Sequence, residues 1–309
     1  MNFHSALFLG FGLLAAPLLV GCGGPSLPPD VTPNALAVEE IRTTLKAAGG
    51  GESSAKASQP EFSNQFATLR GTITLNGTAP ANPVLTVNKD MAVCKPGGRQ
   101  VTNDVVVTGS GNGLANVLVY ADVPDEWVHE SQKGKTEAVN YDQKNCLFTN
   151  RIVGIQKTQS LRLLNSDSVG HNAALKPAKN SSYDATIPGG GEAVYPEAGG
   201  KALVQEKIPF TVSCAAHPWM QSYVIIRNDG YFAVTKEDGS FELPNLPAGV
   251  PVKVMVWHEV IKGVSSKVVN VQPEGIAQKW SKRGAFTVNL EPDSQADLKI
   301  AINGDAFTK

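Results

Sequence analysis

Residues 231–259 are YFAVTKEDGSFELPNLPAGVPVKVMVWHE, and this stretch decides the fold class. Apolar and polar residues alternate on both sides of Asp238-Gly239, a dipeptide that favours a tight turn between two strands. The pattern therefore predicts a β-hairpin at this position. Helical periodicity is almost absent from the chain beyond residue 50, so the surrounding sequence extends the same prediction.

Two further stretches alternate in the same way. They are ATLRGTITLNGTAP (67–80), which turns at Asn76-Gly77, and NVLVYADV (116–123). With 30 Gly, 20 Pro and a formal net charge of −1, the chain is predicted to be an all-β protein. Balanced charge without basic and aromatic clusters argues against a nucleic-acid partner.

The N-terminus, MNFHSALFLGFGLLAAPLLVGCGG (1–24), has the form of an export signal, although its first residues lack Lys and Arg. Residues 19–22, Leu-Val-Gly-Cys, resemble a bacterial lipobox, which implies a lipid on Cys22 and anchoring to a membrane of the cell envelope, facing the periplasm or the cell surface. An ordinary signal peptide that contains a cysteine is the alternative. Residues rich in Gly, Pro, Ser and Ala follow as a tether.

The other cysteines are Cys94, Cys146 and Cys214. Export places the chain where disulfides persist, so Cys94 and Cys146 are predicted to form a structural bridge. Cys214 is then left alone, and its neighbours His217 and Met220 follow at intervals of three in FTVSCAAHPWMQSYVII (210–226).

A lone exported cysteine can be a buried small hydrophobe, a nucleophile or a metal ligand. Nucleophilic catalysis needs a histidine with an orienting partner and a nucleophile turn, and the residues around Cys214 lack that set. A thiolate, two imidazoles and a weak thioether are the ligands of a blue-copper site, because Cu(I) prefers sulfur and Cu(II) accepts imidazole. A second histidine is required, and His171 lies 43 positions before Cys214.

Both segments resemble cupredoxins. LNSDSVGHN (164–172) resembles the segment in which a strand ends in Asn-x-Asp and the first copper histidine precedes Asn. CAAHPWM (214–220) is similar to the Cys-x2-His-x2-Met loop of the amicyanin type. The chain departs from the family at Lys157-Thr158-Gln159, where many members have a Gly-Asp turn, and at Val212, where an aromatic residue is frequent.

The resemblance implies a Greek-key cupredoxin-like β-sandwich with one type 1 copper. It also implies that the downstream histidine exposes its ring edge in an apolar patch, where redox partners dock transiently; burial of the tryptophan in the core is the alternative. The implied residues are His171, Cys214, His217 and Met220 as ligands, Asn172 as a support of the ligand loop, and Pro218 and Trp219 as the docking surface.

A second resemblance concerns the rest of the β-rich chain. DGSFELPNLPAGVPVKVMVW (238–257) resembles the carboxypeptidase regulatory-like, transthyretin-like β-sandwich, and GLANVLVYADV (113–123) resembles an early strand of it. The copper module either precedes this sandwich or is inserted into it. We expect a signal peptide (1–21), a lipid-anchored tether (22–64), a cupredoxin-like copper domain (65–228, core 140–228) and an additional small β-sandwich segment (229–309).

Together these features predict a membrane-anchored carrier of single electrons between redox proteins, and not an enzyme, because such a site needs no open position for substrate. The alternative is a metal-free β-sandwich lipoprotein that binds protein or glycan. Zinc is disfavoured because a structural zinc site would leave Met220 idle. His258, beside Glu259 in a strand, is predicted to be structural, and His129 to be solvated in a polar loop.

Overall fold

The computed structural model describes Glu39, Thr43, residues 60–261 and residues 264–308. The chain divides into two compact units, residues 1–59 and 60–309, and the strands described below belong to the second. The expected signal peptide, the lipidation site Cys22 and most of the expected tether lie outside the described residues. Within the described part, no helix is long and apolar enough to cross a membrane.

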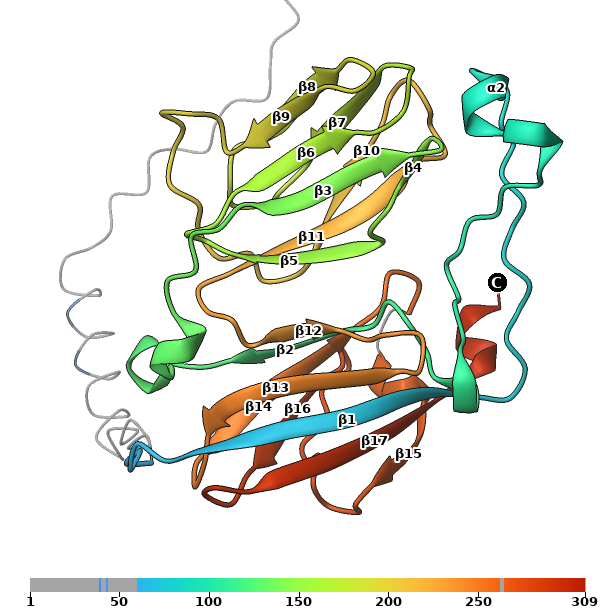
Figure 1. The fold of residues 1–309 in the computed structure, drawn as a ribbon. Coiled ribbons are helices and arrows are strands. Elements are labelled where there is room, and N and C mark those ends of the chain that lie inside the picture. Colours follow the sequence, from blue (N-terminus) through green and yellow to red (C-terminus); the bar gives the residue numbers. More distant parts are fainter. Residues whose placement is uncertain (1–38, 40–42, 44–59, 262–263, 309) are drawn as a thin grey trace, which may run out of the picture. The chain divides into compact units, whose positions relative to one another are not determined.

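Strands dominate the second unit, so the all-β prediction is confirmed (Figure 1). Four sheets have the strand orders β13-β1-β17-β15, β12-β2-β14-β16, β5-β11-β10-β7-β8 and β4-β3-β6-β9. The strands are β1 (Phe66–Asn76), β2 (Leu118–Asp122), β3 (Val139–Lys144), β4 (Leu147–Phe148), β5 (Ile152–Gln156), β6 (Leu161–Asn165), β7 (His171–Leu175), β8 (Tyr183–Ile187), β9 (Glu192–Tyr195), β10 (Phe210–Ser213), β11 (Gln221–Arg227), β12 (Phe232–Val234), β13 (Ser240–Pro247), β14 (Pro251–Trp257), β15 (Val268–Gln272), β16 (Ala285–Asn289) and β17 (Gln295–Asn303).

Helical structure in the described part is short. From residue 60 onward it consists, in the described residues, of α2 (Met91–Cys94) and the 3-10 turns Pro96–Gly98, Ser110–Asn112, Asp125–Trp127, Glu130–Gln132, Val264–Lys267 and Gly304–Phe307.

The first two sheets enclose one apolar core and form what we call the terminal sandwich. Leu69 of β1 and Ile300 of β17 come from one sheet, and Val254 of β14 comes from the other. Alternation places these side chains on the inner face of each strand and leaves polar residues outside, as the sequence pattern predicts. Gly71 is required in β1, because a Cβ there would lie 2.0 Å from the carbonyl oxygen of Leu298 in the parallel partner β17.

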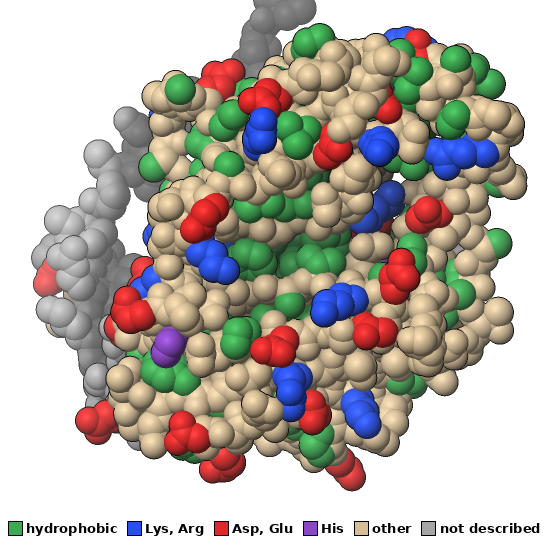
Figure 2. All heavy atoms as spheres, viewed as in Figure 1, with side chains coloured by type: hydrophobic (Ala, Val, Ile, Leu, Met, Phe, Trp, Pro, Cys, Tyr) green, Lys and Arg blue, Asp and Glu red, His purple; other side chains and the backbone are tan. Residues whose placement is uncertain are grey.

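The other two sheets hold strands β3 to β11 and enclose a second core, which defines the inserted sandwich. Its sheet containing β11 packs on the terminal sandwich through a third cluster that includes Tyr120, Ile152 and Ile225. Figure 2 shows apolar side chains between the two sandwiches, with acidic and basic side chains interspersed around them. The buried Arg227 adds polar links, because its Nη2 donates to Ala121 O and to Asp122 Oδ1, both at 2.7 Å.

The order of the strands shows how the two sandwiches are connected. β1 and β2 precede the inserted sandwich in sequence, yet they pair with β13, β17 and β14, which follow it. The module is therefore inserted, and the expected boundary between 65–228 and 229–309 does not coincide with the sheets. A strand belongs to the sheet in which its hydrogen-bonding partners lie, wherever it stands in the sequence.

The predicted hairpin at Asp238-Gly239 is also corrected. A tight turn is present, with Gly239 at φ +77° and Lys236 N–H donating to Ser240 O at 3.1 Å. The flanking strands then separate: β12 pairs with β2, and β13 pairs with β1. The turn thus carries the chain from one sheet of the terminal sandwich to the other.

Residues 77–113, which we call the strap, form most of the long connection from β1 to β2 and contain α2 (Figure 1). The predicted disulfide between Cys94 and Cys146 is present and ties the strap to the turn between β3 and β4 of the inserted sandwich. Both cysteines are fully buried. The bridge thus fixes α2 beside strands that are remote from it in sequence.

Replacing both Cys94 and Cys146 by serine should lower the free energy of unfolding by about 2–4 kcal/mol, because the bridge closes a long loop and restricts the unfolded chain. The bridged residues are 52 positions apart. Urea unfolding followed by tryptophan fluorescence measures the change. Dithiothreitol should destabilise the wild type by a similar amount and leave the variant unaffected; an unchanged midpoint in the variant would contradict the prediction.

Candidate metal centre

The loop between β10 and β11 carries three of the predicted ligands. β10 and β11 are antiparallel, with Ser213 opposite Gln221, so Cys214 and Met220 face each other at the base of the loop. Cys214 N–H donates to Met220 O at 3.3 Å, and Met220 N–H donates to His217 O at 2.9 Å. The short loop therefore turns back on itself and directs His217 towards Cys214.

His171 reaches the same place from a neighbouring strand. It is the first residue of β7, which pairs with β10 at Ala174 and Ser213. The ring is buried, as are Cys214 and His217. Since β7 lies beside β10 in the sheet, residues 43 positions apart in sequence become neighbours at one end of the inserted sandwich.

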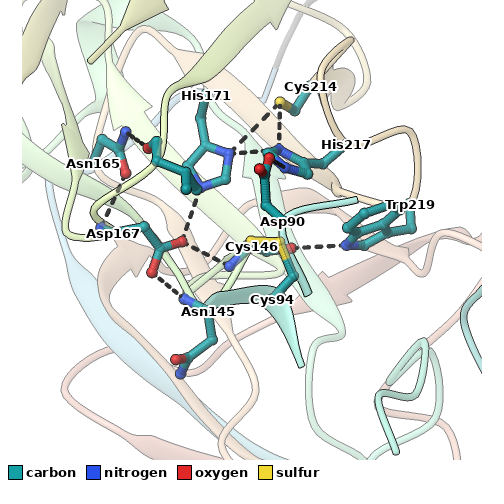
Figure 3. The surroundings of a disulfide bond; sticks show 11 residues. Asp90, Cys94, Asn145, Cys146, Asn165, Asp167, His171, Cys214, His217 and Trp219 are labelled. Atoms are coloured by element: carbon teal, nitrogen blue, oxygen red, sulfur yellow. Dashed lines mark hydrogen bonds and ion pairs between the residues drawn. A yellow bond between two sulfur atoms is a disulfide. The ribbon is translucent and has the colours of Figure 1, made fainter. Parts of the chain in front are cut away.

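Three donor atoms converge in this buried cluster (Figure 3). Cys214 Sγ lies 3.9 Å from His171 Nδ1 and 3.8 Å from His217 Nδ1, and the two Nδ1 atoms are 2.8 Å apart. Met220, the last residue of this loop, is fully buried. The structure thus brings His171, Cys214 and His217 together, with Met220 at the end of the same loop.

The donor atoms fit one metal ion. With metal–nitrogen bonds of about 2.0 Å and metal–sulfur bonds of about 2.3 Å, a trigonal site places its nitrogens about 3.5 Å apart and each about 3.7 Å from sulfur. The nitrogen–sulfur distances of 3.8 and 3.9 Å agree with this arrangement. The nitrogen–nitrogen distance of 2.8 Å is shorter because the two rings share a hydrogen bond.

Asn172 is hydrogen-bonded to the backbone of the loop between β10 and β11. Its Oδ1 accepts from Ala215 N–H at 2.6 Å and from Ala216 N–H at 3.3 Å. Its Nδ2 donates to Asp184 Oδ1 at 2.8 Å, and its own N–H donates to Cys214 Sγ at 3.4 Å. One residue therefore fixes the loop backbone and hydrogen-bonds the candidate thiolate.

Two carboxylates hold the outer nitrogens of the histidines. Asp167 Oδ2 lies 2.8 Å from His171 Nε2, and Asp90 Oδ2 lies 2.8 Å from His217 Nε2. A carboxylate at the outer nitrogen fixes the tautomer and orientation of a metal-binding histidine. With Nε2 protonated, Nδ1 of each ring is left to bind a metal.

Sequence reasoning missed both carboxylates. Asp167 lies within the segment 164–172, four positions before His171. Its place in the short loop between a predicted strand and that histidine could have indicated the contact between them. Asp90 comes from the strap, 127 positions before His217. No local pattern marks it, because only the disulfide-tied path of the strap brings it to the site.

The environment changes the protonation of the cluster. Burial raises the pKa of the Cys214 thiol, but hydrogen bonds from His171, Asn172 N–H and His217 outweigh burial and lower the pKa to about 6. Burial lowers the pKa of His171, but the interactions with Cys214 and Asp167 together raise it by more. The pKa of His171 therefore lies above its ordinary value. In the metal-free protein these shifts favour a thiolate beside a protonated imidazole.

The expectation of an exposed ring edge at the downstream histidine is wrong. His217 has 0% exposed area, because Asp90 and Trp219 cover it. Pro218 is exposed, whereas Trp219 is half-buried and its Nε1–H donates to Cys146 O at 3.0 Å. Trp219 packs against the His217 ring with centroids 5.2 Å apart.

The other two histidines that the structure describes, His129 and His258, stay outside the cluster. His258 is buried against Phe307, and burial lowers its pKa to about 4, which keeps it neutral. His129 is half-buried and its Nδ1 hydrogen-bonds Ser131. Two other groups of close donor atoms include Cys94 or Cys146, whose sulfurs are engaged in the disulfide. Among the described residues, the group of His171, Cys214 and His217 is thus the one with a free thiol.

No family model and no curated protein matches the chain. Among solved structures, the chain is similar to a copper-containing nitrite reductase (NirK) from Thermus scotoductus SA-01, with 12% identity, a TM-score of 0.25 and coverage of 29% of this chain and 22% of that one. It is also similar to amicyanin from Paracoccus versutus, with 17% identity, a TM-score of 0.24 and coverage of 34% and 86%. A third similar structure is the reduced Cu(I) form of an amicyanin mutant at pH 4, with 12% identity, a TM-score of 0.25 and coverage of 29% of this chain and 82% of that one. The chain thus spans less than a quarter of the length of the nitrite reductase.

The thiol of Cys214 should titrate near pH 6 in the metal-free protein, below its ordinary value of 9.0, because the hydrogen bonds it accepts stabilise the thiolate. The thiolate therefore stabilises the folded state fully at a pH above the ordinary pKa of 9.0, and this stabilisation is lost as the pH falls through about 6. Ultraviolet absorbance of the thiolate measures the titration, and subtraction of a Cys214→Ala variant removes every other contribution. A midpoint between pH 8 and 9, the usual range for cysteine, would contradict it.

Proposed function

We propose that this chain is a type 1 copper protein that carries single electrons between redox proteins in a cell envelope. One observation carries the proposal: two imidazole nitrogens and one thiol sulfur converge in a single buried cluster. His171, Cys214, His217 and Met220 would hold the copper. Soft sulfur together with imidazole is the donor set that suits both copper oxidation states.

Bound copper would supply the chemistry by alternating between Cu(I) and Cu(II), one electron at a time. The chain's own contribution is a preformed, buried site. Backbone hydrogen bonds within residues 214–220 and the side chain of Asn172 hold the loop, and carboxylates hold both rings. Rigid ligands suit electron transfer, because little reorganisation accompanies a change of charge. We accordingly propose a carrier and not an enzyme.

The proposal includes a lipid anchor on Cys22 and transient protein partners. An anchor would hold the chain at the membrane while the tether lets the second unit reach its partners. Pro218 is exposed beside the site, and Trp219 connects the His217 ring to the turn between β3 and β4, where it hydrogen-bonds Cys146 O. This part of the ligand loop is the proposed contact for a redox partner.

A second candidate is a metal-free β-sandwich that binds protein or glycan. The observation that favours it is the hydrogen bond of 2.8 Å between the Nδ1 atoms of His171 and His217, which satisfies both rings without an ion. Under this candidate, Cys214 serves only as a buried packing residue. The two candidates differ in one property, the binding of copper.

Addition of Cu(II) to the oxidised full chain should give an intense blue absorption band from thiolate-to-copper charge transfer. Cys214→Ala should abolish the band, since it removes the thiolate, and His129→Ala should retain it as a matched histidine control outside the cluster. Copper content after gel filtration measures retention. A colourless wild type without copper would favour the metal-free candidate, and a Cys214→Ala variant with an unchanged band would overturn the ligand assignment.

Cys22→Ala should release the protein from the membrane fraction when the chain is made in a bacterial host that processes lipoproteins, because a lipid on this cysteine is the proposed anchor. Fractionation followed by immunoblotting measures the distribution. Metabolic labelling with a fatty acid checks the modification itself. An unlabelled wild type that is recovered in the soluble fraction would favour the ordinary signal peptide.

A further inference from the structure

The strap brings a carboxylate from outside both sandwiches to the candidate metal centre (Figure 3). Asp90 Oδ2 lies 2.8 Å from His217 Nε2, and the imidazole has 0% exposed area although Asp90 itself is 32% exposed in its side chain. The carboxylate therefore stands between the ring edge and solvent. Without it, the outer nitrogen of His217 would be left without its acceptor.

A hydrogen bond and the disulfide fix the position of Asp90 relative to the inserted sandwich. Cys94 N–H donates to Asp90 O at 2.9 Å, so the single turn of α2 ties the two residues together. Cys94 is joined to Cys146 by the disulfide, and Cys146 N–H donates to Asp167 Oδ2 at 2.7 Å. That same oxygen lies 2.8 Å from His171 Nε2. A continuous chain of bonds thus runs from one histidine to the other around the outside of the cluster.

We propose that Asp90 is a positioning residue that closes the metal centre from outside, holding His217 with Nε2 protonated and sealing its ring edge from water and from partner proteins. This inference rests on the proposed function for its meaning, although the seal itself can be tested without metal. Asp167 performs the matching task for His171 inside the fold, where its side chain is only 5% exposed.

The two carboxylates also bear on the oxidation state of bound copper. A negatively charged acceptor at the outer nitrogen makes an imidazole more basic, and a more basic ligand favours Cu(II) over Cu(I). Asp90 therefore lowers the reduction potential of the site. A protein partner approaching this edge of His217 would meet Asp90 of the strap in place of the imidazole.

Three variants separate the seal from the charge. Asp90→Asn keeps a side chain of the same shape over the ring and removes the negative charge, whereas Asp90→Ala removes both. Asp104→Asn is the matched control, because Asp104 is an exposed carboxylate of the same strap whose Oδ1 accepts from Thr102 Oγ1, away from the site. All three are made in the full chain.

The seal is measured by the reaction of histidines with diethyl pyrocarbonate in the metal-free protein, located by peptide mapping. Half-buried His129 is the internal reference for reaction, and buried His258 is the reference for protection. We expect His217 to be protected in the wild type, Asp90→Asn and Asp104→Asn. In Asp90→Ala it should react about tenfold faster or more, because the ring no longer needs a local opening to meet the reagent.

Equal protection of His217 in Asp90→Ala and the wild type would overturn the seal. The charge is tested separately by redox titration of the copper-loaded proteins: Asp90→Asn should shift the relative affinity tenfold towards Cu(I), a rise of 59 mV for one electron, and Asp104→Asn should leave the potential unchanged. Equal potentials in Asp90→Asn and the wild type would overturn the electronic role. A wild type that binds no copper would overturn the proposed function. The protection experiment, which uses the metal-free protein, would still test whether Asp90 shields His217.

Discussion

The buried rings of His171 and His217 have a polar partner at each of their nitrogens, and the candidate metal centre is organised around these contacts. On the inner side, the Nδ1 atoms meet each other and the sulfur of Cys214. On the outer side, each Nε2 meets a carboxylate. Leaving one of these nitrogens without a partner would cost about 1–3 kcal/mol, so these contacts stabilise the fold as well as the site.

The outer partners explain why so much of the surrounding structure converges on this region. Asp167 is itself held by the backbone N–H groups of Asn145 and Cys146, both at 2.7 Å. Cys146 in turn anchors the strap and accepts a hydrogen bond from Trp219. The turn between β3 and β4 therefore carries the disulfide, holds the carboxylate of Asp167 and accepts the hydrogen bond from Trp219 of the ligand loop. A shift of this turn would move all three contacts.

The ligand loop was predictable because its information is local. Cys214, His217 and Met220 lie within seven residues between two strands, and antiparallel pairing closes such a loop in one way. The β-strands followed from alternation for the same reason. Pairing between distant strands was not predictable: the turn at Asp238-Gly239 was expected to make a hairpin, but β13 finds its partner in β1. Asp90 was missed on the same grounds, since its contact with His217 depends on the path of the whole strap.

Insertion of one sandwich within the other imposes an order on folding. The inserted sandwich contains only strands β3 to β11, which are contiguous in the chain, so its contacts form by closing comparatively short loops. The parallel ladder of β1 with β17 sets Thr68 opposite Gln295 and must wait until nearly the entire chain is available. Long-range pairing of this kind slows folding and leaves edge strands exposed meanwhile. The candidate metal ligands lie in the module that can form first, whereas Asp90, on the strap after β1, arrives with the part that closes last.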